Sequence, residues 1–332
     1  MKEYLVDVPV QVNIWIRPEC QKKLLEVLQI ARPSIIFLVS DGGRNENEKN
    51  LITQNRALME NGIDWDCKVY KLYKDTNQGI TKIITQTHEF IWQNVDRCIF
   101  LEDDIIPSVS FFRYCKELLE KYENDPRIYI ICGMNHLGVY PDDSGSDYFF
   151  SRQGSIWGYA LWKRSYQEFF DYSYENDAHT WKCLVNNAAE DKFLLNEIKR
   201  RKADTDKKHN WKTYASPTEF FIDLSVYSQH QLQIIPRKNM ISCIGASKQA
   251  NSSDSLSRLP KPVRNLFFMK TYELEFPLKH PNFVVPDKFY EAQRNKIICK
   301  NHPFLNLIRK FVRAFYVLKE GDLKYLWRKI KG

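Results

Sequence analysis

The amino-acid sequence predicts an α/β fold in which helices flank a mostly parallel sheet. Two observations predict this class. Over residues 1–135, short apolar runs alternate with longer segments whose apolar residues recur at helical spacing. Polar or charged residues follow the ends of these runs, as Arg17, Asp41 and Asp103 do. Strands that alternate with helices of this length imply parallel strands joined by crossover helices.

Each element is assigned from its apolar spacing and from the residues that end it. The first strand is a β-branched run that stops before Pro18, the second runs into the turn 41–44, and the second helix ends at Gly62. Ser108 is expected to cap the fourth helix. The predicted strands are 8–16, 34–40, 66–72, 97–101 and 128–132, and the predicted helices are 19–31, 47–61, 81–93 and 109–122. Beyond residue 135 the pattern is less regular, with strands expected at 148–153 and 231–236 and loops at 142–147, 199–213 and 246–257.

Composition narrows the protein class. A chain of 332 residues with 43% hydrophobic residues can form one large domain or two modest ones. The longest apolar runs are too short to span a membrane, and the acidic, mixed start is unlike a secretory signal. The eight cysteines form no CxxC pair, and the seven histidines form no HxxxH or HExxH pattern. We therefore expect reduced thiols and a cytoplasmic location.

The net charge of +8 is concentrated in residues 301–332. This segment contains eight Lys or Arg residues and two acids, so it supplies +6 of the total. A nucleic-acid-binding protein more often spreads basic residues along a working face, so we expect no nucleic-acid partner. Apolar residues recur through the segment at helical spacing. It is therefore either an amphipathic helix on anionic lipid, at the inner face of the cell membrane, or a helical cap docked on the domain with a solvated basic face.

The most informative motif is Leu101-Glu102-Asp103-Asp104, in which an apolar run ends in three carboxylates and is followed by Ile105-Ile106-Pro107. Two carboxylates about 4 Å apart repel by roughly 4 kcal/mol at an effective dielectric constant near 20. Protonation, a basic side chain or a metal ion must compensate this repulsion. Aspartate oxygens suit Mg²⁺ or Mn²⁺ bound jointly with phosphate. The alternative is a solvated acidic strand end.

Several segments in the same order resemble a group of bacterial glycosyltransferases of the GT-A fold that act in capsule, exopolysaccharide or O-antigen synthesis. The resemblance covers about residues 8–250. Its segments are Arg17-Pro18-Glu19, Ser40-Asp41-Gly42-Gly43-Arg44, Asn77-Gln78-Gly79, the LEDD motif with Phe111-Phe112 and Ile131-Cys132-Gly133-Met134-Asn135, Trp157-Gly158-Tyr159-Ala160-Leu161-Trp162-Lys163 and the stretch from Ile235 to Gly245. It implies a nucleotide-diphosphate sugar as donor, with a UDP-sugar favoured, and Mn²⁺ or Mg²⁺ as cofactor.

The resemblance also implies roles for individual residues. Asp104 would bind the metal, Asp103 would contact the ribose or the donor sugar, and Glu102 would lie beside them. The backbone near Ile16 and Asp41 would hold the base and ribose. Further donor-binding candidates are Arg17, Arg44, Gly79, Lys82 and the ring of Trp157, whereas Trp162 is expected in the core. Relatives often carry a histidine or another polar ligand after the late Ile-Gly; here either Asp254 would take that place or the metal would bind water instead.

Transfer with inversion requires a general base that removes the proton from the acceptor hydroxyl. Glu219 is favoured over Asp191, and Asp223 is a weaker candidate. Relatives often carry a Trp-Asp pair where this chain has Thr218-Glu219, and Glu190-Asp191 is equally typical of a helix N-terminus. Retention of configuration stays open.

The sequence thus predicts a metal-dependent glycosyltransferase with a glycan or lipid-linked acceptor. Residues 1–258 would form the catalytic domain, with the nucleotide-sugar half at 1–135 and the acceptor half at 136–258, and residues 259–332 would form a basic, partly helical C-terminal extension. Two alternatives remain: a sugar nucleotidyltransferase, which should carry a Gly-rich loop after the first strand, and a non-catalytic carbohydrate-binding or scaffold protein on the same fold.

Overall fold

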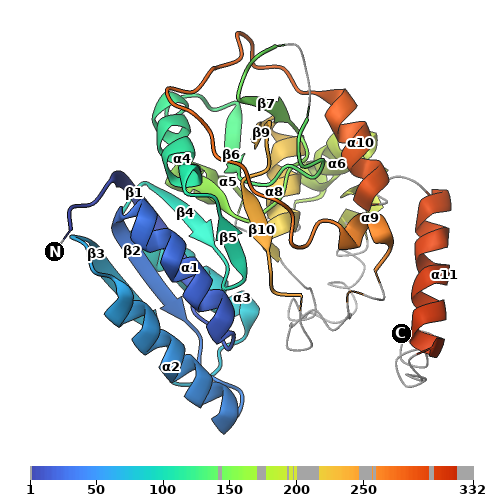
Figure 1. Cartoon of the computed structure of the whole chain (residues 1–332). Helices are drawn as coiled ribbons and strands as arrows, with labels where there is room; N and C mark the ends of the chain where they lie inside the picture. Colours follow the sequence, from blue (N-terminus) through green and yellow to red (C-terminus); the bar gives the residue numbers. More distant parts are fainter. Residues whose placement is uncertain are drawn as a thin grey trace.

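A computed structural model of the chain shows its architecture (Figure 1). It describes residues 2–140, 144–169, 177–192, 194–196, 198–199, 217–246, 256, 259–298 and 303–319. Most of the expected loops 199–213 and 246–257, including Asp254, and the end of the chain after residue 319 lie outside the described residues.

The N-terminal half follows the predicted alternation closely. Its elements are β1 (Val6–Asn13), α1 (Pro18–Ala31), β2 (Pro33–Ser40), α2 (Glu46–Gly62), β3 (Lys68–Tyr73), α3 (Ile80–Trp92), β4 (Arg97–Leu101), β5 (Ile105–Pro107), α4 (Ser110–Lys121) and β6 (Ile128–Cys132). The bounds of β4 and β6 are those predicted. The first strand ends earlier than expected, at Asn13, so Ile14, Trp15 and Ile16 lie in the loop before α1.

The C-terminal half has shorter strands and more connecting chain. Its elements are β7 (Tyr148–Ser151), β8 (Tyr159–Trp162), α5 (Lys163–Phe169), α6 (Ala178–Asn187), the 3₁₀ turn η2 (Ala188–Glu190), α8 (Pro217–Ser228), β9 (Leu232–Pro236), β10 (Ile241–Cys243), α9 (Lys261–Arg264), α10 (Lys288–Ile298) and α11 (Pro303–Lys319). Among the described residues, no helix is both long enough and apolar enough to cross a membrane.

Eight strands form one sheet in the order β3-β2-β1-β4-β8-β6-β9-β7. Its first four strands are parallel throughout, and β6 and β9 form a fourth parallel pair, whereas β8 and β7 run antiparallel to their neighbours. This confirms the predicted α/β class with a mostly parallel sheet. Because β1 leads to β2 on one side and has β4 on the other, the strand order reverses between β1 and β4. Open α/β sheets bind their ligands at such a reversal, beside the carboxyl ends of the strands.

Helices cover both faces of the sheet, so each face has its own apolar core (Figure 1). One core joins Val10 and Val12 of β1 with Leu24 and Leu28 of α1 and with α4. The other core joins Trp92 of α3 with β4, α6 and α8. The two cores make the carboxyl edge of β1 and β4 a rigid support for the residues that follow these strands.

Helix α4 is capped by a distant residue. Ser108 was expected as its N-cap, but the structure shows otherwise, because Ser108 Oγ is buried and makes no hydrogen bond. The carboxylate of Glu273 accepts instead from the N–H groups of Val109, at 3.0 Å, and Ser110, at 2.7 Å. A carboxylate satisfies these free N–H groups and favours the positive end of the helix. The segment after β10 therefore closes over the start of α4.

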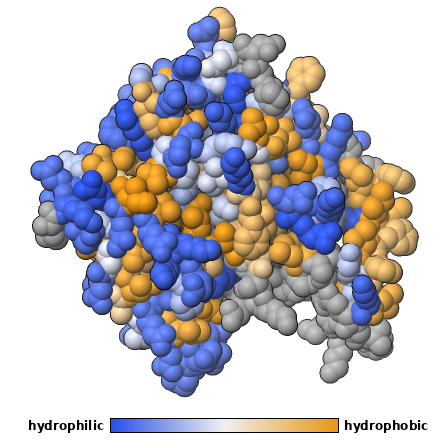
Figure 2. All heavy atoms as spheres, viewed as in Figure 1, coloured by the Kyte–Doolittle hydropathy of each residue, from blue (hydrophilic) through white to orange (hydrophobic). Residues whose placement is uncertain are grey.

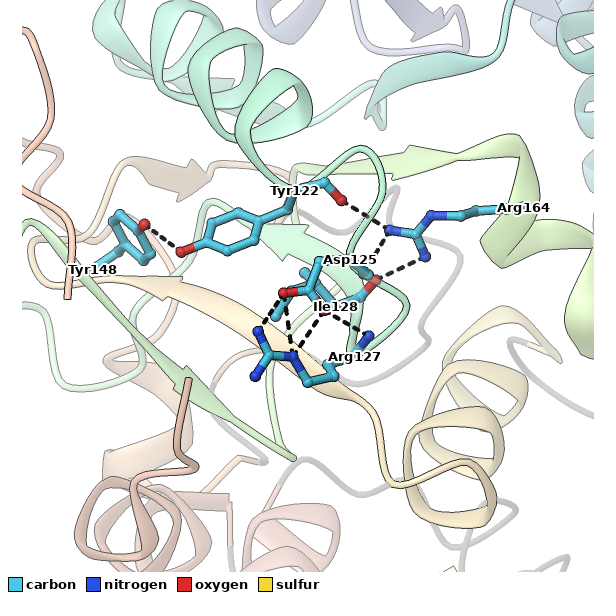
Figure 3. A network of polar contacts seen from close by, with 6 residues as sticks. All are labelled: Tyr122, Asp125, Arg127, Ile128, Tyr148 and Arg164. Carbon is cyan, nitrogen blue, oxygen red and sulfur yellow. Dashed lines mark hydrogen bonds and ion pairs between the residues drawn. The ribbon is translucent and has the colours of Figure 1, made fainter. Parts of the chain in front are cut away.

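The opposite edge of the sheet is held by a network of polar contacts (Figure 3). Arg164, in the first turn of α5, donates to the carbonyl oxygens of Tyr122 at 3.2 Å, Asp125 at 3.2 Å and Ile128 at 3.0 Å. Arg127 pairs with the carboxylate of Asp125 at 2.7 Å. These groups fix the turn between α4 and β6 to the end of β8. Every charge described in this network has a partner, which is typical of a structural role.

Candidate functional site

The acidic cluster lies where the strand order reverses. Arg17 begins α1 after β1, and Glu102, Asp103 and Asp104 follow β4 directly, so both loops emerge at the same edge of neighbouring parallel strands. The register pairs Val12 with Leu101, which fixes the two strand ends beside each other. The fold therefore brings together residues 86 and 87 positions apart in the chain.

Arg17 supplies the positive charge that the acidic cluster requires. Its Nη1 pairs with Asp104 Oδ2 and lies 3.4 Å from Asp103. The side chain of Arg17 is only 9% exposed. Burial disfavours the charged guanidinium, but the charges of Asp103 and Asp104 outweigh this effect and raise the pKa of Arg17. The arginine thus stays charged and compensates the two carboxylates.

Asp103 is incompletely satisfied. Its Oδ2 is buried and accepts no hydrogen bond, and it lies 3.4 Å from Arg17 Nη1 in an ion pair. Burial, followed by the charge of Asp104, raises the pKa of Asp103 to about 7, although Arg17 acts in the opposite direction. The backbone carbonyl of Asp103 is held by Nε2 of Gln21, which is 3.3 Å away. The residue is therefore rigidly placed but retains an oxygen that can accept another positive group.

The pair of strands β5 and β10 packs against Asp104. Ile244 donates its backbone N–H to the carbonyl of Asp104 at 2.9 Å, and Cys243 pairs with Ile105. A Cβ atom on Gly245 would lie only 1.7 Å from Asp104 Oδ2, so position 245 has no room for a side chain while this carboxylate stays in place. The loop after β10 therefore packs directly against the carboxylate of Asp104.

The chemistry of these groups fits a hard divalent cation. The pair offers carboxylate oxygens, one of them buried without a hydrogen-bond donor, and Gly245 adds no side chain beside Asp104. In the described part of the chain no cluster of three or more His, Cys, Asp or Glu could hold a metal. A cation here would take its remaining ligands from water or from phosphate oxygens, as Mg²⁺ commonly does. Glu102 is exposed beside the pair.

Asp41, at the end of β2, is placed very differently. Its carboxylate accepts from the N–H groups of Gly42 and Gln78, each at 2.8 Å, from Gly79 at 3.1 Å and from Asn77 Nδ2 at 3.1 Å. The side chain thus fastens the end of β2 to the loop between β3 and α3. Its oxygens are occupied by the protein itself, so a nucleotide would meet the backbone of this loop.

The other donor-binding candidates of the N-terminal half either contact another residue of the protein or are exposed to solvent. Arg44 forms a two-pronged pair with Glu48, with contacts of 2.6 to 3.0 Å, and its guanidinium lies 5.7 Å from the centre of the Trp15 ring. Hydrogen bonding to Glu48 raises the pKa of Arg44. Gly79, with φ of +82°, is the N-cap of α3, and Lys82 is exposed in its first turn. Of these, the lysine is directly accessible to a phosphate.

The two tryptophans of the Trp-Gly stretch lie in different environments. Trp162 is 3% exposed and donates to the carbonyl of Leu119 at 3.1 Å, which confirms its expected core position. Trp157 is half-buried and packs on Phe267 with ring centres 5.0 Å apart. It precedes Gly158, whose backbone carbonyl accepts from Gly133 at the end of β6. Trp157 therefore lies at the same edge of the sheet as the acidic cluster.

The acids considered as the base occupy unequal positions. Asp191 is 1% exposed, and its carboxylate accepts from Leu194 N–H at 3.1 Å, Tyr227 Oη at 3.2 Å and Gln153 Nε2 at 3.4 Å. The contact with Leu194 is that of a helix cap. Glu219 belongs to the first turn of α8, and its side chain lies outside the described residues. Asp223 lies one turn further along α8.

The sequence did not indicate how several residues shape this site, although Asn77 and Gly245 stand in the quoted motifs. Gln21 bridges the backbone of Asn13, at 3.0 Å, and Asp103; Asn77 holds Asp41; and Trp15 lies under Arg44. Each acts through a contact with a residue far away in the chain. Trp15 was expected inside the first strand, at 8–16, but it lies in the loop after β1, and the signal for Gly245 was its place in the late Ile-Gly. The described cysteines are free thiols, as expected, and Cys299 lies outside the described residues.

Comparisons with known proteins give distant structural likenesses. No protein-family model matches the chain, and no curated protein does. A mannosyltransferase from Pyrobaculum calidifontis, solved with GDP-Man and Mn²⁺, is 11% identical, with a TM-score of 0.34, over 55% of this chain and 54% of its own, so this chain spans about half of its length. A UDP-glucose pyrophosphorylase with bound UDP-glucose is 9% identical, with a TM-score of 0.35, over 71% and 92% of the two chains. A putative glucose-1-phosphate thymidylyltransferase from Bacillus anthracis, solved with sucrose, is 12% identical, with a TM-score of 0.31, over 50% and 76%. Likenesses of this extent assign no function to the chain.

Proposed function

We propose that the protein is a metal-dependent glycosyltransferase of the GT-A type that uses a nucleotide-diphosphate sugar. The observation that carries the proposal is the Asp103–Asp104 pair at the reversal of strand order, with a buried oxygen that accepts no hydrogen bond. A site of this kind, at the carboxyl edge of parallel strands, suits a ligand that brings its own phosphates. The ordered sequence motifs support the same assignment.

In this proposal Asp104 holds Mn²⁺ or Mg²⁺, and Asp103 contacts the ribose or the donor sugar, with Glu102 beside them. The bound metal would stabilise the negative charge of the leaving diphosphate. In the structure, the Arg17 guanidinium pairs with the Asp104 carboxylate. It must therefore turn away from Asp104 when a cation binds there. It would then lie within reach of the donor phosphates, which an arginine recognises well.

The nucleotide would lie across the ends of β1 and β2. The loop that Asp41 holds in place offers backbone groups to the base and ribose, and Lys82 and Arg44 border the same edge. Trp157 would provide an apolar face for a sugar ring on the other side of β4. A UDP-sugar is the favoured donor, and the acceptor would be a glycan or a lipid-linked oligosaccharide in surface polysaccharide synthesis, on the cytoplasmic side of the membrane. In this division residues 1–135 bind the donor, 136–258 face the acceptor and 259–332 form an extension.

The proposed reaction is a direct displacement with inversion. The acceptor hydroxyl oxygen forms a bond to the anomeric carbon, the bond from this carbon to the diphosphate breaks, and the base takes the hydroxyl proton. Glu219 is the preferred base, because both carboxylate oxygens of Asp191 already accept hydrogen bonds within the protein. If this is right, Glu219→Gln retains donor binding and loses transfer, whereas Asp191→Asn chiefly lowers stability.

Calorimetric titration with UDP, in the presence and absence of Mn²⁺, tests the proposal. We expect nucleotide binding that depends on the metal, together with slow release of UDP from a UDP-sugar when no acceptor is present. A panel of common nucleotide sugars then identifies the donor. Release of pyrophosphate from UTP and a sugar phosphate would instead establish a nucleotidyltransferase, and the absence of any nucleotide binding would leave a scaffold or carbohydrate-binding protein.

A further inference from the structure

Helix α11 presents an apolar face to solvent. Phe304, Phe311 and Phe315 are 72, 67 and 64% exposed, respectively. Leu307, Ile308 and Leu318 are exposed as well. The six positions are spaced by three or four residues, so they form one stripe along the helix. Helix α11 lies at one side of the molecule, and apolar residues gather over it in the space-filling view (Figures 1 and 2).

The residues on the other face of the helix are less exposed. Val317 is fully buried, and Leu305, Arg309, Val312 and Tyr316 are partly buried. The stripe is therefore the most exposed face of the described helix. An exposed, continuous set of large apolar side chains costs free energy in water and commonly marks a binding surface. The stripe needs an occupant that covers it.

The charged residues beside the stripe indicate which kind of partner would cover it. Lys310 and Lys319 are exposed, and each lies on the helix surface next to one border of the apolar stripe. The whole segment 301–332 carries eight basic residues against two acids. Two copies of so basic a segment would repel each other, whereas an anionic surface would attract it. A helix with an apolar face and lysine borders matches the interface of a bilayer that contains acidic lipids.

We propose that this stripe docks the protein on an anionic lipid bilayer, with α11 lying in the plane of the interface. The helix of 17 residues is about 25 Å long. Its phenylalanines would enter the boundary between headgroups and acyl chains, and its lysines would meet acidic headgroups. This inference goes beyond the proposed function and does not depend on it. If both hold, the surface would keep the catalytic site near a lipid-linked acceptor.

Flotation of the full-length protein with vesicles tests the proposal. The vesicles contain either phosphatidylcholine alone or equal amounts of phosphatidylcholine and phosphatidylglycerol. We expect binding to the mixed vesicles that weakens with added salt, and at least about tenfold weaker binding for the variant with Phe311→Ser and Phe315→Ser. Replacing Lys310 and Lys319 by Gln should weaken binding to the mixed vesicles by about fivefold per lysine.

A matched control carries Leu5→Ser and Ile30→Ser, which remove two apolar side chains that are each 59% exposed. Leu5 directly precedes β1 and Ile30 belongs to α1, and both elements lie on the other side of the molecule from α11 in Figure 1. This control should bind vesicles like the wild type, and circular dichroism should show that both variants fold. Undiminished binding by the Phe311/Phe315 variant would overturn the proposal. It would also be overturned if the wild type ignored the mixed vesicles but formed a dimer that this variant loses, because the stripe would then bind a second copy.

Discussion

Two aspartates at the ends of nearby parallel strands, Asp41 after β2 and Asp104 after β4, illustrate two uses of a carboxylate. Asp41 is surrounded by three backbone N–H groups and one side-chain amide. Asp104 and its neighbour Asp103 share a single arginine, and one oxygen of Asp103 accepts no hydrogen bond. Both positions are typical ligand-binding positions in an α/β sheet. Their partners nevertheless differ in kind.

The difference separates a structural acid from a ligand-binding acid. Backbone N–H groups cannot leave Asp41 without unfolding the loop that carries them, so its charge is committed to the fold. A side chain such as Arg17 can rotate away, so the charges of Asp103 and Asp104 can be transferred to another cation. An acid at a strand end is thus a better candidate for metal binding when its partner is a side chain that can rotate and when its oxygens do not all accept hydrogen bonds.

The largest effect is expected from Asp104→Ala. If Asp104 holds the metal, glycosyl transfer at saturating acceptor should fall by about a thousandfold, because the leaving diphosphate loses its compensating charge. The free energy of unfolding without metal should change little, since Arg17 still pairs with Asp103. Steady-state kinetics and urea unfolding measure the two quantities. Asp96→Ala, which removes an exposed carboxylate just before β4, is the matched control, and equal losses of activity in both variants would show that Asp104 has no special role.

The next effect is expected from Asp41→Ala, and it should appear in stability. The substitution leaves four donors without their acceptor, so the free energy of unfolding should fall by about 3 kcal/mol. Asp41→Asn keeps a carbonyl oxygen and should lose less. The affinity of the folded variant for Mn²⁺ in the presence of UDP should stay near that of the wild type. A stable Asp41→Ala protein with impaired metal binding would remove the distinction between the two acids.

A smaller effect is expected from Arg17→Met, which tests whether the partner of the acidic pair can be exchanged. In a chelating buffer the variant should be less stable by about 2 kcal/mol, because two close carboxylates lose their only described cation. Added Mn²⁺ should restore most of this loss and should raise the melting temperature of the variant more than that of the wild type. If Mn²⁺ stabilised neither protein, the acids would have to be regarded as a structural ion-pair cluster.

The sequence predicted the alternation of strands and helices in the N-terminal half because each element there is set by local spacing. It located β4 and the acids after it for the same reason. It could not predict that Arg17 pairs with these acids or that Glu273 caps α4. It also could not predict that Asn77 and Gly79 donate hydrogen bonds to Asp41. Each of these contacts joins distant segments of the chain. The amphipathic pattern of α11 was visible as well. Whether this segment binds lipid or caps the domain stays a prediction, and the apolar stripe of the described helix is exposed.

The central claim is that Asp103 and Asp104, and not Asp41, hold a divalent cation. Electron paramagnetic resonance of Mn²⁺ tests this claim most directly. Free Mn²⁺ is titrated with the wild type, Asp104→Asn and Asp41→Asn, each in the presence of UDP. We predict that the wild type and Asp41→Asn deplete the free-ion signal equally and that Asp104→Asn does so only at much higher protein concentration. Equal depletion by Asp104→Asn and the wild type would contradict the account.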